Sequence, residues 1–252
     1  MDVDAVLVTG AARRIGAAIA RDFAAQGWAV AVHHNASADT ARALVDEING
    51  AGGRAVALAA DLGDAAATDA LIAAAREALG PLTCLVNNAS RFVPDDIDSF
   101  SAAEWDAHLN PNLRAPAQLT HHFAAQLAEG AAGNVINIAD QRVWRLLPDF
   151  LSYTVSKAGL WALTRTTAMA LAPRIRVNAI GPGPVLPSER QSQATFDASC
   201  AATPLGRGTS PAEICAAIRF ILSAPAMTGQ MIALDGGEHL DWRPNTPDSV
   251  QA

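Results

Sequence analysis

Short runs of apolar residues, many of them β-branched, alternate along the chain with longer alanine-rich stretches of helical periodicity. The apolar runs predict seven strands, at 4–8, 28–33, 54–59, 82–86, 133–138, 174–179 and 231–234. The alanine-rich stretches predict helices at 14–26, 38–50, 65–79, 101–129, 152–171 and 211–222, the fourth broken near Pro111 and Pro116. This alternation predicts a doubly wound α/β fold, in which helices cover both faces of a parallel sheet.

No repeat, Ser/Gly-rich linker or run of like charges divides the chain, so the pattern predicts a single domain over residues 1–252. One long stretch, 181–210, is rich in Pro and Gly and lacks periodicity. Loops of this length commonly cover or bind a ligand. We therefore interpret 184–210 as a lid over a substrate site at the carboxyl ends of the strands.

Composition narrows the classes of partner. With 18 Lys and Arg against 25 Asp and Glu, the net charge is −7, which disfavours nucleic acid and anionic membranes. The three cysteines form no CxxC pair, so neither a disulfide framework nor a thiolate metal site is indicated. The N-terminus lacks a basic, apolar signal pattern, and no apolar run approaches 18 residues. We expect a cytoplasmic protein without a membrane partner.

The first strand runs into Thr9-Gly10-Ala11-Ala12-Arg13-Arg14-Ile15-Gly16 and then a helix, the context that a dinucleotide phosphate loop requires. Gly10 permits a tight turn and Gly16 permits close packing, while the helix N-terminus offers N–H groups to a pyrophosphate. Two glycines also occur in ordinary strand-to-helix turns, so the loop alone leaves that alternative open.

The second strand ends in His33-His34-Asn35-Ala36-Ser37, where NAD-binding folds place an acid for the adenosine ribose. No carboxylate stands there. His34, Asn35 and Ser37 can instead donate hydrogen bonds to a 2′-phosphate, and Arg13 can supply the charge, which predicts NADPH as cofactor. We interpret the histidine pair otherwise as a solvated strand end rather than a metal site, because no carboxylate ligands accompany it.

Tyr153 and Lys157 stand four residues apart at the start of a predicted helix, so their side chains share one face. An ammonium beside a phenol lowers the phenol pKa from about 10 toward the working range. Tyr153 is therefore a candidate proton donor to a substrate that receives hydride.

Over nearly its whole length the chain resembles the short-chain dehydrogenase/reductase family. The matching segments are Thr9 to Gly16, Asp61-Leu62, Asn87 to Ser90, Asn112-Leu113, Tyr153 to Lys157 and Gly181-Pro182-Gly183. The resemblance implies that Asn88 and Ala89 support the sheet and cofactor, that Asp61 approaches the adenine, that Asn112 maintains a proton relay, and that Pro182 and Gly183 cap the nicotinamide. It also implies a Rossmann-like fold and a homotetramer.

Two departures from the general family pattern are informative. Arg14 replaces the middle glycine of the loop, and Asp140, thirteen residues before the tyrosine, replaces the catalytic serine. Ser90 follows Asn88-Ala89 in place of a glycine, and Phe92 comes two residues later. This combination is similar to pteridine reductases, including dihydromonapterin-reductase-like members.

The physics of the reaction favours the same substrate class. An ionised Asp140 would repel the oxyanion that develops in carbonyl reduction, whereas it can accept hydrogen bonds from the N–H and amino groups of a pterin. Phe92 offers a face for a flat heterocycle, Arg14 would lie between pyrophosphate and ligand, and Ser90 adds a hydroxyl. Taken singly, Phe92 could pack in the core or lid, Arg14 could only neutralise pyrophosphate, and Asp140 could be a surface carboxylate.

The sequence thus predicts an NADPH-dependent reductase of pterins, converting dihydropterin to tetrahydropterin, with dihydrofolate as a further candidate substrate. The predicted catalytic residues are Asn112, Asp140, Tyr153 and Lys157, and no metal is predicted. The predicted cofactor contacts are Gly10, Arg13, Arg14, Ile15, Gly16, His34, Asn35, Ser37, Asp61, Leu62, Asn88, Ala89, Ser90, Tyr153, Lys157, Pro182 and Gly183. The predicted substrate contacts are Arg14, Ser90, Phe92, Asp140 and Tyr153. The alternatives are a carbonyl or 3-oxoacyl reductase and a non-catalytic NADPH-binding regulator.

Overall fold

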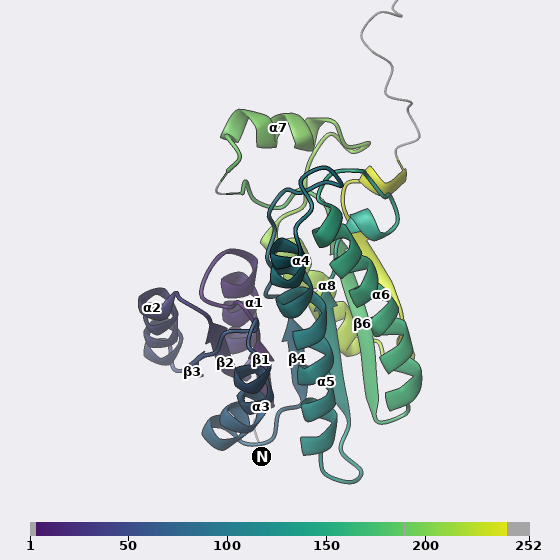
Figure 1. Ribbon diagram of the computed structural model, residues 1–252. Helices are drawn as coiled ribbons and strands as arrows, with labels where there is room; N and C mark the ends of the chain where they lie inside the picture. The colour runs from purple at the N-terminus through teal and green to yellow at the C-terminus, as the bar shows by residue number, and fades with distance from the viewer. Residues whose placement is uncertain (1–3, 189, 241–252) are drawn as a thin grey trace, which may run out of the picture.

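Parallel strands form the centre of the molecule. The computed structural model describes residues 4–188 and 190–240, and within them seven strands pair in the order β3-β2-β1-β4-β5-β6-β7 (Figure 1). The strands are β1 (Ala5–Val8), β2 (Ala29–His34), β3 (Arg54–Ala59), β4 (Cys84–Asn87), β5 (Gly133–Ile138), β6 (Ile175–Pro182) and β7 (Met231–Leu234). Every pair is parallel, which confirms the predicted doubly wound fold. The order reverses between β1 and β4, so a crevice opens there at the carboxyl ends.

Helices cover both faces of the sheet, as Figure 1 shows. One layer consists of α1 (Arg14–Ala25), α2 (Ala38–Gly50) and α8 (Pro211–Ser223), and the other of α3 (Ala65–Leu79), α5 (Ala115–Gln126) and α6 (Leu151–Leu171). The shorter α4 (Ala102–Leu109) and α7 (Gln193–Ala201) lie toward the carboxyl ends of the strands. Two single turns of 3₁₀ helix, η2 (Gln141–Val143) and η3 (Glu238–Leu240), also belong to this end.

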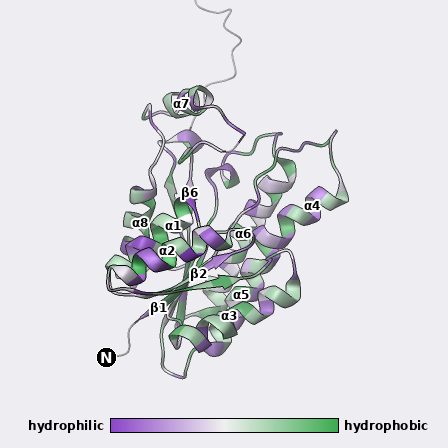
Figure 2. Cartoon of the chain, turned by 90° about the vertical axis from the view of Figure 1, so that its left-hand side faces the viewer, coloured by the Kyte–Doolittle hydropathy of each residue, from purple (hydrophilic) through white to green (hydrophobic). Residues whose placement is uncertain are grey.

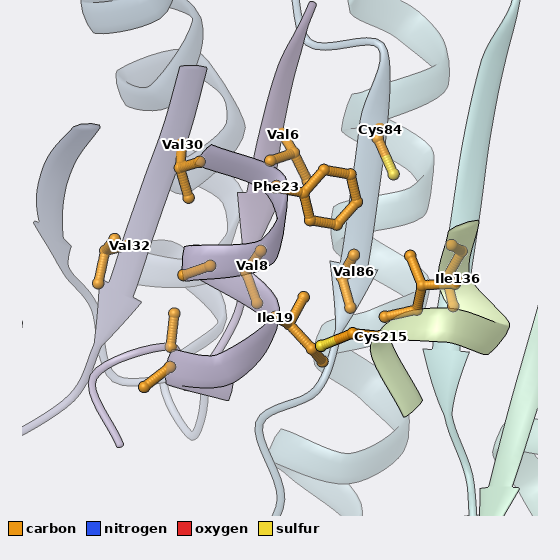
Figure 3. Packing of buried hydrophobic residues seen from close by; sticks show 14 of the residues in the cluster. Val6, Val8, Ile19, Phe23, Val30, Val32, Cys84, Val86, Ile136 and Cys215 are labelled. Carbon is orange, nitrogen blue, oxygen red and sulfur yellow. The ribbon is translucent and has the colours of Figure 1, made fainter. Parts of the chain in front are cut away.

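The core has two halves because the strand side chains alternate between the two faces of the sheet. Val6 and Val8 of β1 pack with Ile19 and Phe23 of α1, as Figure 3 shows. Leu7 faces the opposite layer, which includes Phe123 of α5. In Figure 2 the apolar residues accordingly gather between the layers and the polar residues on the outer faces of the helices. Burial on both faces explains why the strand sequences are continuously apolar.

The predicted break near Pro111 and Pro116 is wrong. One helical rod runs from α4 through a π-helical segment, η1 (Asn110–Arg114), into α5, and it ends at Gln126 rather than at 129. Pro111 lies in the first turn of the π-helical segment and Pro116 in the first turn of α5. At both places the changed hydrogen-bond register accommodates the missing N–H of proline, so the rod continues.

The stretch 181–210 is also more regular than predicted. Strand β6 continues to Pro182, and α7 occupies Gln193–Ala201 with the hydroxyl of Ser192 accepting the Thr195 N–H at its start. Residue 189 of the predicted lid, and residues 1–3 and 241–252 of the predicted domain, lie outside the described residues. Within the described ranges, no helix is long and apolar enough to cross a membrane.

Candidate active site

The predicted phosphate loop is a tight cradle between β1 and α1. Gly10 has a φ of +62°, and a Cβ atom there would lie 2.9 Å from the Ala89 Cα. A Cβ atom on Gly16 would lie 2.3 Å from the Gly10 carbonyl oxygen. The Asn88 carboxamide donates to the Thr9 carbonyl at 2.8 Å, which holds the end of β4 against the loop. Only glycine fits at the two loop positions, as close approach of backbone to a ligand requires.

The N-cap residue of α1, Arg13, makes no capping hydrogen bond with its side chain to the first turn of the helix. The N–H groups of this turn therefore face a cavity of about 980 Å³ with their partial positive charge. The glycine cradle and the N-terminus of α1 fit a dinucleotide pyrophosphate, so the residues present suit the predicted cofactor.

Most predicted binding residues line this one cavity. They are Gly10, Arg13, Arg14, Ile15, Gly16, His34, Asn35, Ser37, Asp61, Leu62, Asn88, Ala89, Ser90 and Phe92. The predicted residues Asn112, Asp140, Tyr153, Lys157, Pro182 and Gly183 are not among those that line it. Phe92 joins the two groups, because its ring lines the cavity and meets the Tyr153 ring edge-on with 4.7 Å between the centroids.

Asp140, Tyr153 and Lys157 converge behind Phe92. The Tyr153 hydroxyl donates to the Asp140 carboxylate at 2.6 Å, and the other Asp140 oxygen accepts the Arg142 N–H at 2.8 Å. The Lys157 ammonium donates to the Ile138 carbonyl at 2.8 Å. Tyr153 is 6% exposed and Lys157 2% exposed. The spacing of 13 residues between Asp140 and Tyr153 thus joins the end of β5 to the first turn of α6.

The expected lowering of the Tyr153 pKa is wrong for this arrangement. Burial and the adjoining Asp140 carboxylate raise the pKa of Tyr153 well above 10. Burial also raises the pKa of Asp140, against the hydrogen bond from Tyr153. For Lys157, burial lowers the pKa to about 8, against the attraction of Asp140. The ammonium lies 5.7 Å from the centroid of the Tyr153 ring, too far to outweigh a carboxylate in direct contact.

The N-terminus of α6 depends on a residue that sequence reasoning missed. The buried Asp95 carboxylate accepts the Ser152 N–H at 3.1 Å and the Ser152 hydroxyl. Phe150 precedes the helix in a left-handed conformation, with φ 56°. A carboxylate at a helix N-terminus satisfies the first N–H groups and suits the helix dipole. Asp95 therefore fixes the turn that presents Tyr153.

The histidine pair at the end of β2 is buried, so its interpretation as a solvated strand end is wrong. His33 Nδ1 accepts the Gly10 N–H at 3.0 Å, and Nε2 lies 3.0 Å from the Ala60 carbonyl, which requires the neutral ring with hydrogen on Nε2. Burial lowers the pKa of His33 to about 4. His34, a predicted cofactor contact, lines the cavity, whereas His33 holds the phosphate loop through Gly10.

Phe92 presents less free surface than the predicted stacking platform. One face stacks on the Phe150 ring, with the centroids 4.3 Å apart and the planes 3° apart, and the Arg142 guanidinium lies 5.0 Å from the centroid of Phe150. Phe92 remains 44% exposed.

Arg14 reaches away from the loop. Its guanidinium donates to the carbonyls of Pro187 at 2.8 Å and Leu186 at 3.2 Å, which ties the start of α1 to the segment after β6. Its φ of 56° is in the left-handed region, where the general family pattern has glycine. Ser90, a predicted contact of both cofactor and substrate, donates a hydrogen bond from its hydroxyl to the Arg91 carbonyl at 3.3 Å.

The other predicted residues take their places around these groups. The Asn112 carboxamide binds the backbone of Arg91 and the Ser156 hydroxyl, and the relay role stays a prediction. Asp61 accepts the Gly63 N–H at 2.8 Å and lines the cavity, and its approach to the adenine stays a prediction. Gly183 follows the end of β6, and a Cβ atom there would lie 3.0 Å from a Glu238 carboxylate oxygen. Glu238, which sequence reasoning missed, is half-buried, and burial raises its pKa.

Comparison with known proteins matches nearly the whole chain. The family described as enoyl-(acyl carrier protein) reductase matches residues 10–239. A 3-oxoacyl-[acyl-carrier-protein] reductase from Synechocystis is 32% identical over 235 residues, covering 92% of this chain and 95% of the relative.

Two solved structures resemble the fold closely. FolM alternative dihydrofolate reductase 1 from Brucella suis, in complex with NADP, is 47% identical with a TM-score of 0.93, covering 96% of this chain and 97% of its own. The same enzyme from Brucella canis, complexed with NADP, is 47% identical with a TM-score of 0.94 and covers 98% of both chains. The glycine cradle, the YxxxK pair on α6 and these matches agree: the chain belongs to the short-chain dehydrogenase/reductase family of oxidoreductases.

Proposed function

We propose that this protein is an NADPH-dependent pterin reductase that converts a dihydropterin to a tetrahydropterin. The observation that carries the proposal is the Asp140 carboxylate in direct hydrogen bond with the Tyr153 hydroxyl at 2.6 Å. Negative charge that developed on a carbonyl oxygen beside Tyr153 would meet this carboxylate at close range. In a ring C=N bond, the atom that takes up the proton is instead a basic nitrogen. A pterin also carries N–H groups that can donate hydrogen bonds to a carboxylate.

NADPH is the cofactor that the cavity suits. Asn35 and Ser37 line it beyond the end of β2, and Arg13 lines it at the start of α1, so a 2′-phosphate would find hydrogen-bond donors and a positive charge in this cavity. The two Brucella structures, at 47% identity, are complexes with NADP. When bound, the reduced nicotinamide supplies a hydride to the substrate ring carbon.

The protein residues manage the accompanying proton. The high pKa of Tyr153 keeps its hydroxyl protonated at neutral pH, the state that a donor requires. Addition of hydride to the carbon of C=N and of this proton to the nitrogen completes the reduction. Asp140 orients the hydroxyl through its hydrogen bond, and Lys157 provides a buried positive charge near both groups. Phe92 provides an apolar face for the flat ring.

A carbonyl or 3-oxoacyl reductase is the second candidate, and the Synechocystis relative favours it. Asp140 argues against it, because such enzymes need a neutral donor to the carbonyl oxygen. The cytoplasmic location and the homotetramer implied by the family resemblance are also proposals, and size-exclusion chromatography with light scattering tests the tetramer.

The test is a steady-state assay with NADPH and a panel of dihydropterins, dihydrofolate, ketones and 3-oxoacyl thioesters. We expect turnover of at least one dihydropterin or dihydrofolate. Tyr153→Phe should abolish most of that turnover and leave NADPH affinity unchanged, while Asp140→Ser should lower it and maintain or raise any trace activity on ketones. Reduction of ketones or oxoacyl thioesters alone by the unaltered protein would replace the pterin proposal with the second candidate.

A further inference from the structure

We infer that His108 is a positioning residue for substrate binding, because its buried neutral imidazole holds the backbone of the segment that carries Phe92. We call residues 88–101, which contain neither helix nor strand, the Phe92 loop. The inference rests on the proposed function only for the identity of the substrate. That His108 fixes the loop follows from its own contacts.

Alternate residues of the Phe92 loop are held from the protein interior. The Asn112 carboxamide accepts the Arg91 N–H at 2.8 Å and donates to the Arg91 carbonyl at 3.0 Å. Two residues on, the Val93 N–H donates to His108 Nε2 at 3.2 Å. Two residues further, the Asp95 carbonyl accepts the Leu151 N–H at 3.1 Å. Phe92 lies between the first two of these attachments, with its ring against Tyr153.

Among these attachments, His108 provides the one nearest to Phe92 on its C-terminal side. Its side chain is fully buried on α4. Because Nε2 accepts the Val93 N–H, the ring hydrogen must be on Nδ1, which lies 3.1 Å from the Glu104 carbonyl and 3.4 Å from a Glu104 carboxylate oxygen. The other tautomer would place two donors face to face.

The same imidazole lies beside the proposed proton donor. Its centroid is 6.4 Å from that of the Tyr153 ring, and the two planes meet at 71°. Glu104 also binds the Arg91 guanidinium in a two-pronged ion pair at 2.8 Å, so His108, Glu104 and the loop form one connected group. His108 is not among the described residues that line the cavity. Its effect is to set where the Phe92 ring stands relative to Tyr153.

Three variants test this role. His108→Leu removes the acceptor, His108→Gln offers an amide oxygen near the Nε2 position, and His122→Leu is the matched control, since that partly exposed histidine on α5 pairs with Asp69. The substrate is the best dihydropterin found for the unaltered protein. The measurements are its KM and kcat, the NADPH Kd, and hydrogen–deuterium exchange of the peptide that covers residues 91–95.

We expect His108→Leu to raise the substrate KM by about 5- to 100-fold, the range for leaving one buried polar group without its partner, with kcat changed much less. NADPH Kd should stay within about twofold, because no cofactor contact changes. Exchange at Val93 should accelerate by about 2- to 10-fold, the equivalent of one lost hydrogen bond. His108→Gln should restore the substrate KM and the exchange rate most of the way to those of the unaltered protein. His122→Leu should change neither quantity.

Unchanged exchange and unchanged KM in His108→Leu would overturn the inference. So would an equal rise in KM for both His108 variants, because it would show that packing rather than the acceptor matters. If the unaltered protein reduced only ketones, the pterin proposal would fail, and the same comparison made with the ketone would still decide the role of His108. If His108→Leu did not fold, nitrogen NMR of histidine-labelled unaltered protein decides: hydrogen on Nδ1 is required, and hydrogen on Nε2 excludes the role.

Discussion

His33 shows how one buried neutral ring can organise a binding loop. It accepts a hydrogen bond from Gly10 and, with hydrogen on Nε2, donates one to Ala60, so it joins the phosphate loop to the end of β3. A protonated imidazole would have two donors and no acceptor, and the Gly10 N–H would then face another donor. Protonation therefore opposes both the fold and the loop.

This arrangement predicts a loss of stability in mild acid. The His33 pKa is lowered from 6.5 to about 4, so in that window the unfolded chain takes up a proton that the folded protein does not. The free energy of unfolding should therefore fall as pH falls from 6.5 to 4, by about 3 kcal/mol from this residue. Urea unfolding of the unaltered protein and of His33→Gln, at neutral pH and near pH 4, measures the difference.

The variant should be less stable at neutral pH but should lose less on acidification, since glutamine does not titrate. The Asp and Glu carboxylates titrate equally in both proteins, so their contributions to the pH dependence cancel in the comparison. The same pH dependence in the two proteins would contradict the role given to His33.

Residue-scale prediction from the sequence succeeded where spacing alone sets geometry. Tyr153 and Lys157 share a helix face, and the interval to Asp140 places its carboxylate on the Tyr153 hydroxyl. It missed partners that meet only through the fold: Asp95 reaches Ser152 across 57 residues of chain, and nothing local to either residue signals the contact. The direction of the Tyr153 pKa was wrong for the same reason, since it depends on burial and on the carboxylate in contact.

At the scale of elements, Arg14 joins the start of α1 to the segment between β6 and α7. The two hydrogen bonds to the Leu186 and Pro187 carbonyls hold that segment beside the cavity, which Ser188 lines. Arg14→Ala keeps a Cβ atom at this left-handed position and removes the rest of the side chain, including the guanidinium. We expect protease cleavage within 184–210 to become several-fold faster, because the loop loses its attachment to the rigid part of the fold.

Limited proteolysis with mass spectrometry of the fragments measures this. Arg54→Ala is the matched control, because Arg54 also donates to a backbone carbonyl, that of Ala78, at 2.8 Å, but at the start of β3. Cleavage of 184–210 at the same rate in Arg14→Ala and Arg54→Ala would show that Arg14 does not hold the segment.

Element boundaries were predictable where the apolar period changes abruptly and less so elsewhere. Strands β3, β5 and β7 and helices α2 and α3 occupy the predicted residues. Proline misled the prediction at Pro111, because a π-helical turn can absorb it without ending the rod. Helix α7 was not predicted because none of its residues is buried, so its sequence carries no amphipathic pattern.

At the scale of the whole molecule, cofactor binding should appear as stability. A ligand that binds only the folded state at 100 times its Kd adds about 2.7 kcal/mol to the free energy of unfolding. For a protein of this size that corresponds to a rise in Tm of about 5–10 °C. We expect NADPH to raise Tm more than NADH at equal concentration, because Arg13 and the donors at the end of β2 favour a 2′-phosphate.

Arg13→Ala should narrow the difference between the two cofactors in differential scanning fluorimetry. Arg165→Ala is the control, since that exposed residue lies on α6 above Trp161. Equal shifts by NADPH and NADH in the unaltered protein would refute the cofactor preference.

Tyr153 is the sole tyrosine in the 252 residues of the chain. A fluorinated tyrosine supplied during expression would therefore label one position, and its fluorine NMR signal would report the ionisation of the proposed donor without any substitution. Fluorine itself makes a phenol more acidic, so free fluorotyrosine is the reference: the signal should remain in the phenol form at pH values where free fluorotyrosine is ionised, since burial and the Asp140 carboxylate raise the pKa of Tyr153. In Asp140→Asn the carboxylate charge is gone, and the signal should shift at lower pH. The composition of the chain thus makes its central hydroxyl directly observable.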